Sequence, residues 1–259
     1  MIGGKGTMTD MKNIESGITL QHVKKKLGKM EVLHDVTLQI PTGSIYGLLG
    51  PSGCGKSTTV KIMTGILSPD EGTTYVLGEK MPKLSVMKNI GYMAQAAALY
   101  PTLTAYENMK FFGSLYGIPK KTLEGRIQYL AELVNLKDDL HKITNAFSGG
   151  MKQRLSLAIT LIAEPQVLIL DEPAVGIDPV LRKSIWDELY RLSEQNVTIL
   201  VTTHVMDEAE KCFELAMMRD GEILATGTPQ EIKQKAKVDT IEEAFIYFGN
   251  SKEAGGRLK

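Results

Sequence analysis

A glycine-rich stretch is the clearest candidate for chemistry in this chain. Residues 50–58 read GPSGCGKST, which fits the pattern G-x-x-x-x-G-K-[ST]. In such a loop, between a strand and a helix, the backbone N–H groups wrap the phosphates of a nucleotide. Lys56 is expected to neutralise the β- and γ-phosphate oxygens, and Ser57 to ligate Mg²⁺. The candidate phosphate-binding residues are Gly50, Pro51, Ser52, Gly53, Cys54, Gly55, Lys56, Ser57 and Thr58.

A second candidate anion site lies in NAFSGGMKQR, at 145–154. The hydroxyl of Ser148 and the backbone N–H groups of Gly149 and Gly150 stand at the expected start of a helix. The first N–H groups of a helix have no partner within it, and the positive end of the helix dipole lies there. A phosphate would bind well at this point. One chain therefore carries two phosphate-type sites.

Polar residues follow three further apolar stretches. Asp171 and Glu172 follow the apolar run VLIL, Gln95 ends NIGYMAQ, and His204 follows TILVTT. The carboxyl ends of parallel strands meet at the edge where open α/β sheets bind ligands. We expect Asp171 to hold Mg²⁺ through water and Glu172 to orient or deprotonate an attacking water. Taken alone, the acids also fit a solvated strand end, and the histidine and glutamine fit ordinary polar positions.

The periodicity of apolar residues predicts an α/β fold around these motifs. A mainly helical stretch is expected over 96–163, where Thr104 and Glu107 form a capping box. Between the last two predicted core strands, Asp178 is expected to cap a helix that begins at Pro179. The predicted strands are 18–23, 32–40, 44–49, 167–171 and 198–203.

Two turn signals mark the C-terminal part. Asp220-Gly221, between two apolar runs, predicts a hairpin. Thr228, followed by Pro229 and, three positions after the threonine, by Glu231, predicts a further helix start. This part of the chain should therefore add a hairpin and then helices.

Composition narrows the class of protein. The hydrophobic content of 43% suits a folded globular chain, and Lys plus Arg equals Asp plus Glu at 30 each. A neutral balance gives no reason to expect a nucleic-acid partner. The apolar runs fall far short of the roughly 20 residues that span a bilayer. Two cysteines, Cys54 and Cys212, offer no disulfide framework, which is consistent with the cytoplasm.

The motifs, in this order, resemble those of the ATP-binding cassette family, the ATPase subunits of ABC transporters. The resemblance covers about 18–232 and rests on the phosphate loop, Gln95, FSGGMKQR, VLILDEP, GID and His204. It implies an α/β P-loop NTPase core with an antiparallel β subdomain and an inserted α-helical subdomain. It also implies ATP and Mg²⁺ as cofactors.

The resemblance implies a division of the chain into parts. A single ABC ATPase domain is expected over 17–249, with disordered or flexible ends at 1–16 and 250–259. Within it, the expected parts are a RecA-like core with the antiparallel β subdomain at 17–95 and 164–232, the helical subdomain at 96–163, and a C-terminal helical extension at 233–249.

The resemblance also implies roles for single residues. Gln95 would sense Mg²⁺ and the attacking water, and His204 would contact the γ-phosphate. Ser148, Gly149 and Gly150 would cap the γ-phosphate held by a second subunit, in a homo- or heterodimer. Asp178 would lie at the seam of that dimer, beside the partner's phosphate loop.

Two positions predict individual behaviour. Leu27 stands where the family usually has an aromatic residue that stacks on adenine, which predicts looser base selectivity. Cys54, inside the phosphate loop beside Lys56, is expected to be a partly activated thiol.

The function implied is ATP-driven export through a separate membrane permease that docks near the aromatic-rich segment 96–117. The chain would then lie in the cytoplasm, on the inner face of the cell membrane. The stretch DEPAVGIDPVLRKSIWDEL and the short tail VDTIEEAFIYFG resemble exporter subunits more than importer subunits. An importer subunit and a soluble ABC ATPase of DNA repair or translation remain as alternatives; a module that only senses nucleotide would be expected to lack one of the catalytic residues.

Overall fold

A six-stranded sheet lies at the centre of the computed structural model, which describes residues 16–173 and 176–256. Its order is β10-β9-β3-β8-β7-β6, and only the β9/β10 pair is antiparallel. Every residue of β3, β7 and β8 is buried, which explains the apolar runs within these strands. The strands are β3 (Ile45–Leu49), β6 (Ile90–Met93), β7 (Val167–Asp171), β8 (Thr198–Thr203), β9 (Glu214–Arg219) and β10 (Glu222–Gly227).

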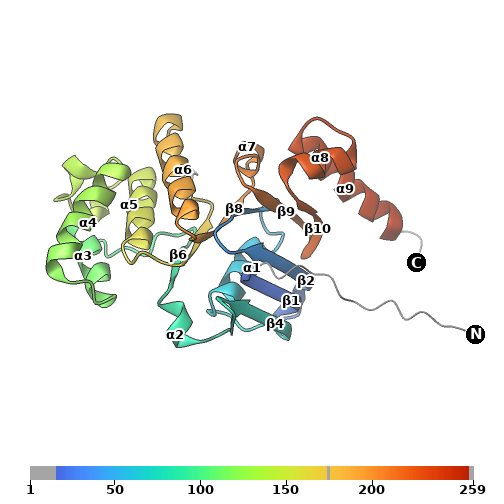
Figure 1. Cartoon of the computed structure of the whole chain (residues 1–259), viewed down its shortest axis with the longest axis horizontal. Helices are drawn as coiled ribbons and strands as arrows, with labels where there is room; N and C mark the ends of the chain where they lie inside the picture. Colours follow the sequence, from blue (N-terminus) through green and yellow to red (C-terminus); the bar gives the residue numbers. More distant parts are fainter. Residues whose placement is uncertain (1–15, 174–175, 257–259) are drawn as a thin grey trace, which may run out of the picture.

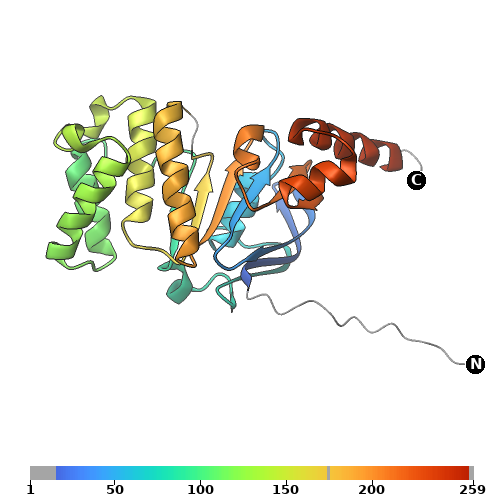
Figure 2. The same cartoon turned by 45° about the horizontal axis from the view of Figure 1, so that its top comes forward.

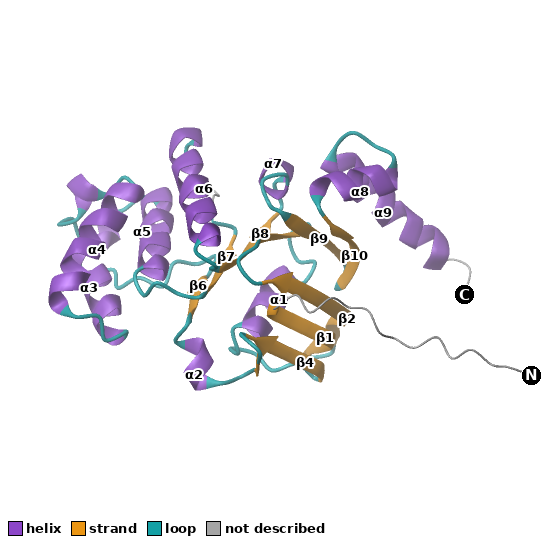
Figure 3. Cartoon of the chain, in the orientation of Figure 1, coloured by secondary structure: helices purple, strands orange, loops and turns teal. Residues whose placement is uncertain are grey.

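A second, antiparallel sheet of order β2-β1-β4-β5 packs beside the first (Figures 1 and 3). The helix α1 (Lys56–Met63) shares one buried apolar cluster with both sheets, so the phosphate loop that precedes it is held between them. The strands of this sheet are β1 (Ser16–Leu27), β2 (Met30–Pro41), β4 (Glu71–Val76) and β5 (Glu79–Lys80).

A helical lobe stands at one end of the molecule (Figures 1 and 2). It contains α3 (Ala105–Leu115), α4 (Lys120–Leu133) and α5 (Gly149–Leu161), with short 3-10 turns at Lys137–Asp139 and Thr144–Ala146. The capping box expected at the start of α3 is present. The lobe is not a separate body, because its buried side chains continue into the sheet.

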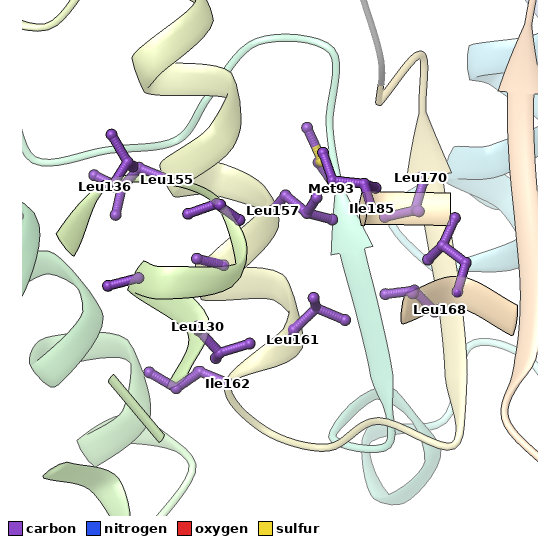
Figure 4. Close-up of a cluster of buried hydrophobic side chains, with 14 of the residues drawn as sticks. Met93, Leu130, Leu136, Leu155, Leu157, Leu161, Ile162, Leu168, Leu170 and Ile185 are labelled. Atoms are coloured by element: carbon purple, nitrogen blue, oxygen red, sulfur yellow. The ribbon is translucent and has the colours of Figure 1, made fainter. Parts of the chain in front are cut away.

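Figure 4 shows this continuity. Leu130 of α4 and Leu157 of α5 belong to the same buried cluster as Leu168 and Leu170 of β7 and Ile185 of α6 (Pro179–Glu194). The helix that carries the second anion motif therefore packs against the strand that ends at Asp171, directly before Glu172.

The start of α6 agrees with the sequence prediction. Asp178 Oδ1 accepts hydrogen bonds from the backbone N–H groups of Val180 (3.1 Å) and Leu181 (3.0 Å), and Pro179 is the first helical residue. Proline fits there because its missing N–H would have had no partner.

The C-terminal part packs on the outer strands of the six-stranded sheet. The turn at Asp220-Gly221 joins β9 to β10 as predicted. The predicted capping box of Thr228 and Glu231 opens α8. The helices outside the lobe are α2 (Leu84–Met87), α7 (Met206–Ala209), α8 (Pro229–Ala236) and α9 (Ile241–Gly256). Within the described ranges, no helix has the length and apolarity that crossing a membrane requires.

Two expected ends differ from the structure. Ser16 already pairs with Pro41 in the antiparallel sheet, although 1–16 was expected to be disordered. The last helix α9 continues to Gly256 rather than ending at 249, and Lys, Glu and Ala at 252–254 are residues that a helix accommodates well. The remainder of both expected ends, 1–15 and 257–259, lies outside the described residues.

Candidate functional site

The candidate residues gather at the carboxyl edge of the six-stranded sheet. The phosphate loop follows β3, and Glu172 follows β7, whose last residue is Asp171. His204 follows β8, and Gln95 stands two positions after β6. Four neighbouring parallel strands thus deliver these groups to one edge, which is where α/β sheets hold ligands.

The phosphate loop is curled tightly around the Lys56 ammonium. Lys56 Nζ donates hydrogen bonds to the carbonyl oxygens of Gly50 (2.7 Å) and Pro51 (3.0 Å). The N–H of Gly50 donates to the carbonyl of Thr203 (3.1 Å), which ties the loop to the end of β8. A Cβ at Gly50 would lie 2.3 Å from the carbonyl oxygen of Met218, so only glycine fits. The loop is therefore shaped by close backbone approach.

An oxygen-rich pair lies beside the loop. Ser57 Oγ donates to Asp171 Oδ2 at 2.9 Å, and Thr202 Oγ1 donates to Asp171 Oδ1 at 2.5 Å. Asp171 is only 2% exposed. Burial raises the pKa of the neighbouring Tyr92 hydroxyl, and the charge of Asp171 raises it further. The carboxylate is thus held in a fixed orientation by two hydroxyl donors.

Glu172 is the point where the other candidate residues meet. Its Oε1 lies 3.8 Å from Lys56 Nζ and 3.2 Å from His204 Nδ1, and its Oε2 accepts from Gln95 Nε2 at 3.3 Å. The side chain is largely buried, with a relative exposure of 11%. A carboxylate among a cation, an imidazole and an amide is well placed to take part in proton transfer.

Two hollows adjoin Glu172. A cavity of about 140 Å³ lies over the phosphate loop, with Lys56, Ser57, Gln95 and Glu172 in its lining. A second cavity, of about 320 Å³, shares Gln95 and Glu172 with the first and continues to the start of α5, at Gly150. Glu172 therefore lies between the phosphate loop and the second anion motif.

The second anion motif begins α5. Ser148 caps this helix, and its Oγ accepts from the N–H of Met151 at 3.2 Å. Ser148 and Gly149 are exposed. One turn further on, Gln153 Nε2 donates to the backbone carbonyl of Glu172 at 3.3 Å, which connects the motif to the carboxylate edge of its own chain.

Asp178 is not brought into this cluster, since its carboxylate caps α6. Sequence reasoning also missed two residues that do contact the cluster, Thr202 and Gln153. The only available signals were that Thr202 stands two positions before His204 and that Gln153 lies one helical turn after Gly149. Neither signal distinguishes a site residue from a core or surface residue.

The expected activation of the Cys54 thiol is wrong in sign. Burial raises the pKa of Cys54, and the nearby Lys56 only partly opposes this effect. The side chain is 4% exposed and turned into the core beneath the loop. A thiol with a raised pKa carries less of the nucleophilic thiolate at neutral pH.

Two apolar side chains, Leu27 and Val32, stand on the β1/β2 hairpin, and neither is aromatic. Leu27, the last residue of β1, is half exposed, and Val32 of β2 lines the cavity over the loop. The structure keeps Leu27 on the surface of the β1/β2 hairpin, where it offers an adenine ring no π-face.

The fold and the loop together define a nucleotide-binding protein of the P-loop class. The family model described as "ABC transporter" matches residues 33–175, which is more than half of the chain. The chain therefore belongs to the ABC transporter family and carries its ATP-binding cassette, an ATPase domain.

Relatives with assigned names agree with this family. The chain is 39% identical over 239 residues to the "Probable multidrug ABC transporter ATP-binding protein YbhF" of Escherichia coli (strain K12), covering 90% of this chain and 41% of that protein. It is 36% identical over 231 residues to the "Linearmycin resistance ATP-binding protein LnrL" of Bacillus subtilis (strain 168), covering 87% of this chain and 74% of that protein. The chain thus spans about two fifths of the first relative.

Solved structures share the fold. An "ATP binding subunit of ABC transporter" superposes with a TM-score of 0.84 at 25% identity, covering 90% of this chain and 99% of that one. The ATP-binding cassette MJ0796, solved as a dimer in a post-hydrolysis state with ADP and Pi, superposes with a TM-score of 0.75 at 26% identity, covering 82% and 98%.

Proposed function

We propose that this chain binds and hydrolyses ATP at the Glu172 edge and so drives export through a separate membrane permease. The observation that carries the proposal is the convergence of Lys56, Gln95 and His204 on the one carboxylate of Glu172. Such a cluster beside a phosphate loop provides both charge neutralisation and a base for an attacking water.

The phosphates of ATP would be held by the loop and by Lys56, whose ammonium would turn from the loop carbonyls to the phosphate oxygens. Glu172 would accept a proton from the attacking water. His204, 3.2 Å from Glu172, would contact the γ-phosphate and keep the carboxylate oriented. Gln95 would hold the water on the other side of Glu172.

The residues beside the loop fit Mg²⁺. This ion prefers oxygen ligands and is usually held by one or two protein groups together with phosphates and water. Ser57 Oγ and Asp171 Oδ2 lie 2.9 Å apart, and Gln95 adds an amide close to Glu172. Bound Mg²⁺ would neutralise charge on the β- and γ-phosphates.

The exposed start of α5 supports dimerisation. Ser148, Gly149 and Gly150 would complete the ATP site of a second, identical or related subunit, with Asp178 at the seam. The dimeric state of the MJ0796 cassette supports dimerisation here.

The proposed permease contact is the segment 96–117. Tyr100 and Phe111 meet edge to face at 4.9 Å between ring centroids, and both are exposed. Leu115 and Tyr116 continue this apolar surface, and a cavity of about 220 Å³ beside it includes Tyr116 in its lining. Docking here would place the chain on the inner face of the membrane.

The names of the relatives favour export over import. They include a multidrug transporter, a linearmycin resistance protein and, in Ralstonia nicotianae, a Nod factor export protein that is 37% identical over 229 residues. These substrates belong to those proteins, and the cargo of this chain would be a small molecule of its own permease.

The substitution Glu172→Gln tests the proposed hydrolysis. We expect the ATPase rate to fall by about 10²-fold or more, because the amide cannot accept the proton. ATP binding should persist, and the dimer formed with ATP should accumulate in size-exclusion chromatography. Glu194→Gln, on the exposed end of α6, serves as the control and should leave the rate unchanged. Normal hydrolysis by Glu172→Gln would overturn the assignment.

A further inference from the structure

The end of β8 contains a threonine that no recognised motif includes. Thr202 is fully buried, and its side chain lies between the two carboxylate residues of the site. Its Oγ1 donates to Asp171 Oδ1 at 2.5 Å and accepts from the backbone N–H of Glu172 at 3.1 Å. We propose that Thr202 is a positioning residue for ATP hydrolysis that sets the orientation of both Asp171 and Glu172. This inference rests on the proposed function.

The two hydrogen bonds of the hydroxyl have fixed directions. A backbone N–H can only donate, so the hydroxyl oxygen must accept from Glu172. The single hydroxyl hydrogen is then left for Asp171 Oδ1. One atom of Thr202 therefore orients the carboxylate of Asp171 and anchors the backbone of Glu172 at the same time.

Asp171 depends on this donor for its orientation. Thr202 holds Oδ1, and Ser57 holds Oδ2 at 2.9 Å. With both oxygens engaged, the carboxylate plane cannot rotate, and Oδ2 stays on the side of Ser57 where the proposed Mg²⁺ would bind. Removal of the hydroxyl would leave Oδ1 buried without this donor and free the carboxylate to turn.

Glu172 depends on Thr202 through its backbone. Its φ is 55°, in the left-handed region that non-glycine residues seldom adopt. The N–H of Glu172 donates to both the carbonyl (3.2 Å) and the Oγ1 (3.1 Å) of Thr202. Residues held in this region persist only where the surroundings fix them. Thr202 thus helps to hold the sharp turn that aims the Glu172 side chain at Lys56, Gln95 and His204.

The same strand contains a matched control. Thr198 is also fully buried, and its Oγ1 accepts from the backbone N–H of Gly43 at 3.2 Å. It stands at the opposite end of β8, away from the nucleotide edge. Thr198→Val and Thr202→Val remove the same group from the same strand, but only Thr202 contacts Asp171 and Glu172.

The experiment compares Thr202→Val, Thr202→Ser and Thr198→Val in the full chain. We expect Thr202→Val to lower kcat by about tenfold or more, as loss of a group that orients metal ligands commonly does. The KM for ATP should stay close to that of the parent, since the phosphate loop is untouched. Thr202→Ser, which keeps the hydroxyl, should restore most of kcat. Thr198→Val should keep the parental kcat even if its Tm falls.

A binding measurement provides a second readout. Mn²⁺ affinity, measured by electron paramagnetic resonance in the presence of a non-hydrolysable ATP analogue, should weaken in Thr202→Val and remain in Thr198→Val. If Thr202→Val does not fold, Thr202→Ala compared with Thr202→Ser makes the same test.

Three results would overturn the inference: parental kcat in Thr202→Val, an equal loss of kcat in Thr198→Val, or a rise in KM alone. Glu172→Gln separates this outcome from a failure of the proposed function. If Glu172→Gln loses hydrolysis and Thr202→Val does not, only the positioning role fails. If Glu172→Gln hydrolyses normally, the site itself is wrong and the inference fails with it.

Discussion

The phosphate loop and the start of α5 use the same local physics in opposite surroundings. Both present a serine and glycine N–H groups at a helix start. The loop is closed on itself: Lys56 Nζ is held by the carbonyl of Gly50, whose N–H is tied to Thr203. At the start of α5, a Cβ added at Gly149 would meet nothing within 4 Å. One site is built within the chain, whereas the other presents an open surface.

This difference explains why one chain carries two anion motifs. The loop has its carboxylates close by: Ser57 Oγ lies 2.9 Å from Asp171 Oδ2, and Lys56 Nζ lies 3.8 Å from Glu172 Oε1. Among the described residues, the start of α5 offers Ser148 and the first N–H groups of the helix, so the proposed role needs phosphates brought by another surface. Yet it is not isolated, because Gln153 reaches the carbonyl of Glu172 at 3.3 Å. Phosphate binding at the start of α5 would thus affect Glu172, beside the phosphate loop, through this hydrogen bond.

Removal of the Lys56 ammonium from the phosphate loop should have the largest effect on hydrolysis. Lys56→Ala takes away the charge that faces Glu172 at 3.8 Å and that the phosphates require. We expect hydrolysis to fall by about 10³-fold and nucleotide binding to weaken at the same time. Fluorescent-nucleotide titration and phosphate release measure the two effects.

The control for this prediction is Lys61→Ala, which removes an exposed lysine from the same helix α1. It should leave both binding and hydrolysis near the parental values. Equal losses in the two variants would mean that α1, rather than the ammonium of Lys56, is what the site requires.

Blocking the open motif should separate binding from turnover. Ser148→Arg places a long side chain where the partner's phosphates would sit, so we expect ATP-driven dimerisation and hydrolysis to be lost by about 10²-fold. Binding of ATP to the single chain should be spared. Ser148→Ala removes the cap of α5 without the bulk, and so measures the loss of helix stability, about 1 kcal/mol, by itself. If Ser148→Arg lost ATP binding by the single chain, the start of α5 would belong to the chain's own ATP site and not to that of a partner.

The two motifs also differ from the rest of the site in how much the sequence reveals. A glycine loop and a Ser-Gly-Gly helix start are local patterns, so their place and the anionic type of their ligand follow from the residues alone. Thr202 lies in the buried run TILVTT, where its neighbour Thr203 has the same side chain but faces Glu208 instead. Which of the two threonines meets Asp171 depends on strand register, Asp171 opposite Thr202, and that is a tertiary property.

Burial is the other property that the sequence did not reveal. Beside Lys56, a thiol at Cys54 suggested activation by charge. The fold instead places Cys54 in the cluster shared by α1 and both sheets, where loss of solvent outweighs the lysine. The helical end at Gly256 was missed for a simpler reason, since Ser-Lys-Glu-Ala fits either a helix or a tail.

The reactivity of Cys54 tests the closed character of the loop. Because the thiolate is the nucleophile and the pKa of Cys54 is raised, alkylation by iodoacetamide should be slow at pH 7. The rate should rise as the pH increases through the raised pKa, and ATP should slow it further. Mass spectrometry of the labelled peptide gives the rate, with urea-unfolded protein as the reference.

Cys212 supplies the internal control for this measurement. Burial raises its pKa to about 12, so its alkylation should also be slow at neutral pH and gives the rate of a buried thiol outside the loop. Rapid labelling of Cys54 at neutral pH would show that the loop opens often and is not closed on itself.

The smallest expected effect concerns Leu27, the position at which an aromatic ring would stack on adenine. Leu27 is 47% exposed at the end of β1 and offers no π-face. Leu27→Tyr should tighten ATP binding by about 1 kcal/mol, roughly fivefold, if the new ring stacks on adenine. Leu84→Tyr, at the exposed start of α2, adds the same ring away from the hairpin and should change nothing. A lower KM for ATP than for CTP in Leu27→Tyr alone would place the base beside β1, because the larger purine gains more from stacking. Unchanged KM values for both nucleotides would mean that the phosphates, and not the base, determine the affinity of the site for nucleotide.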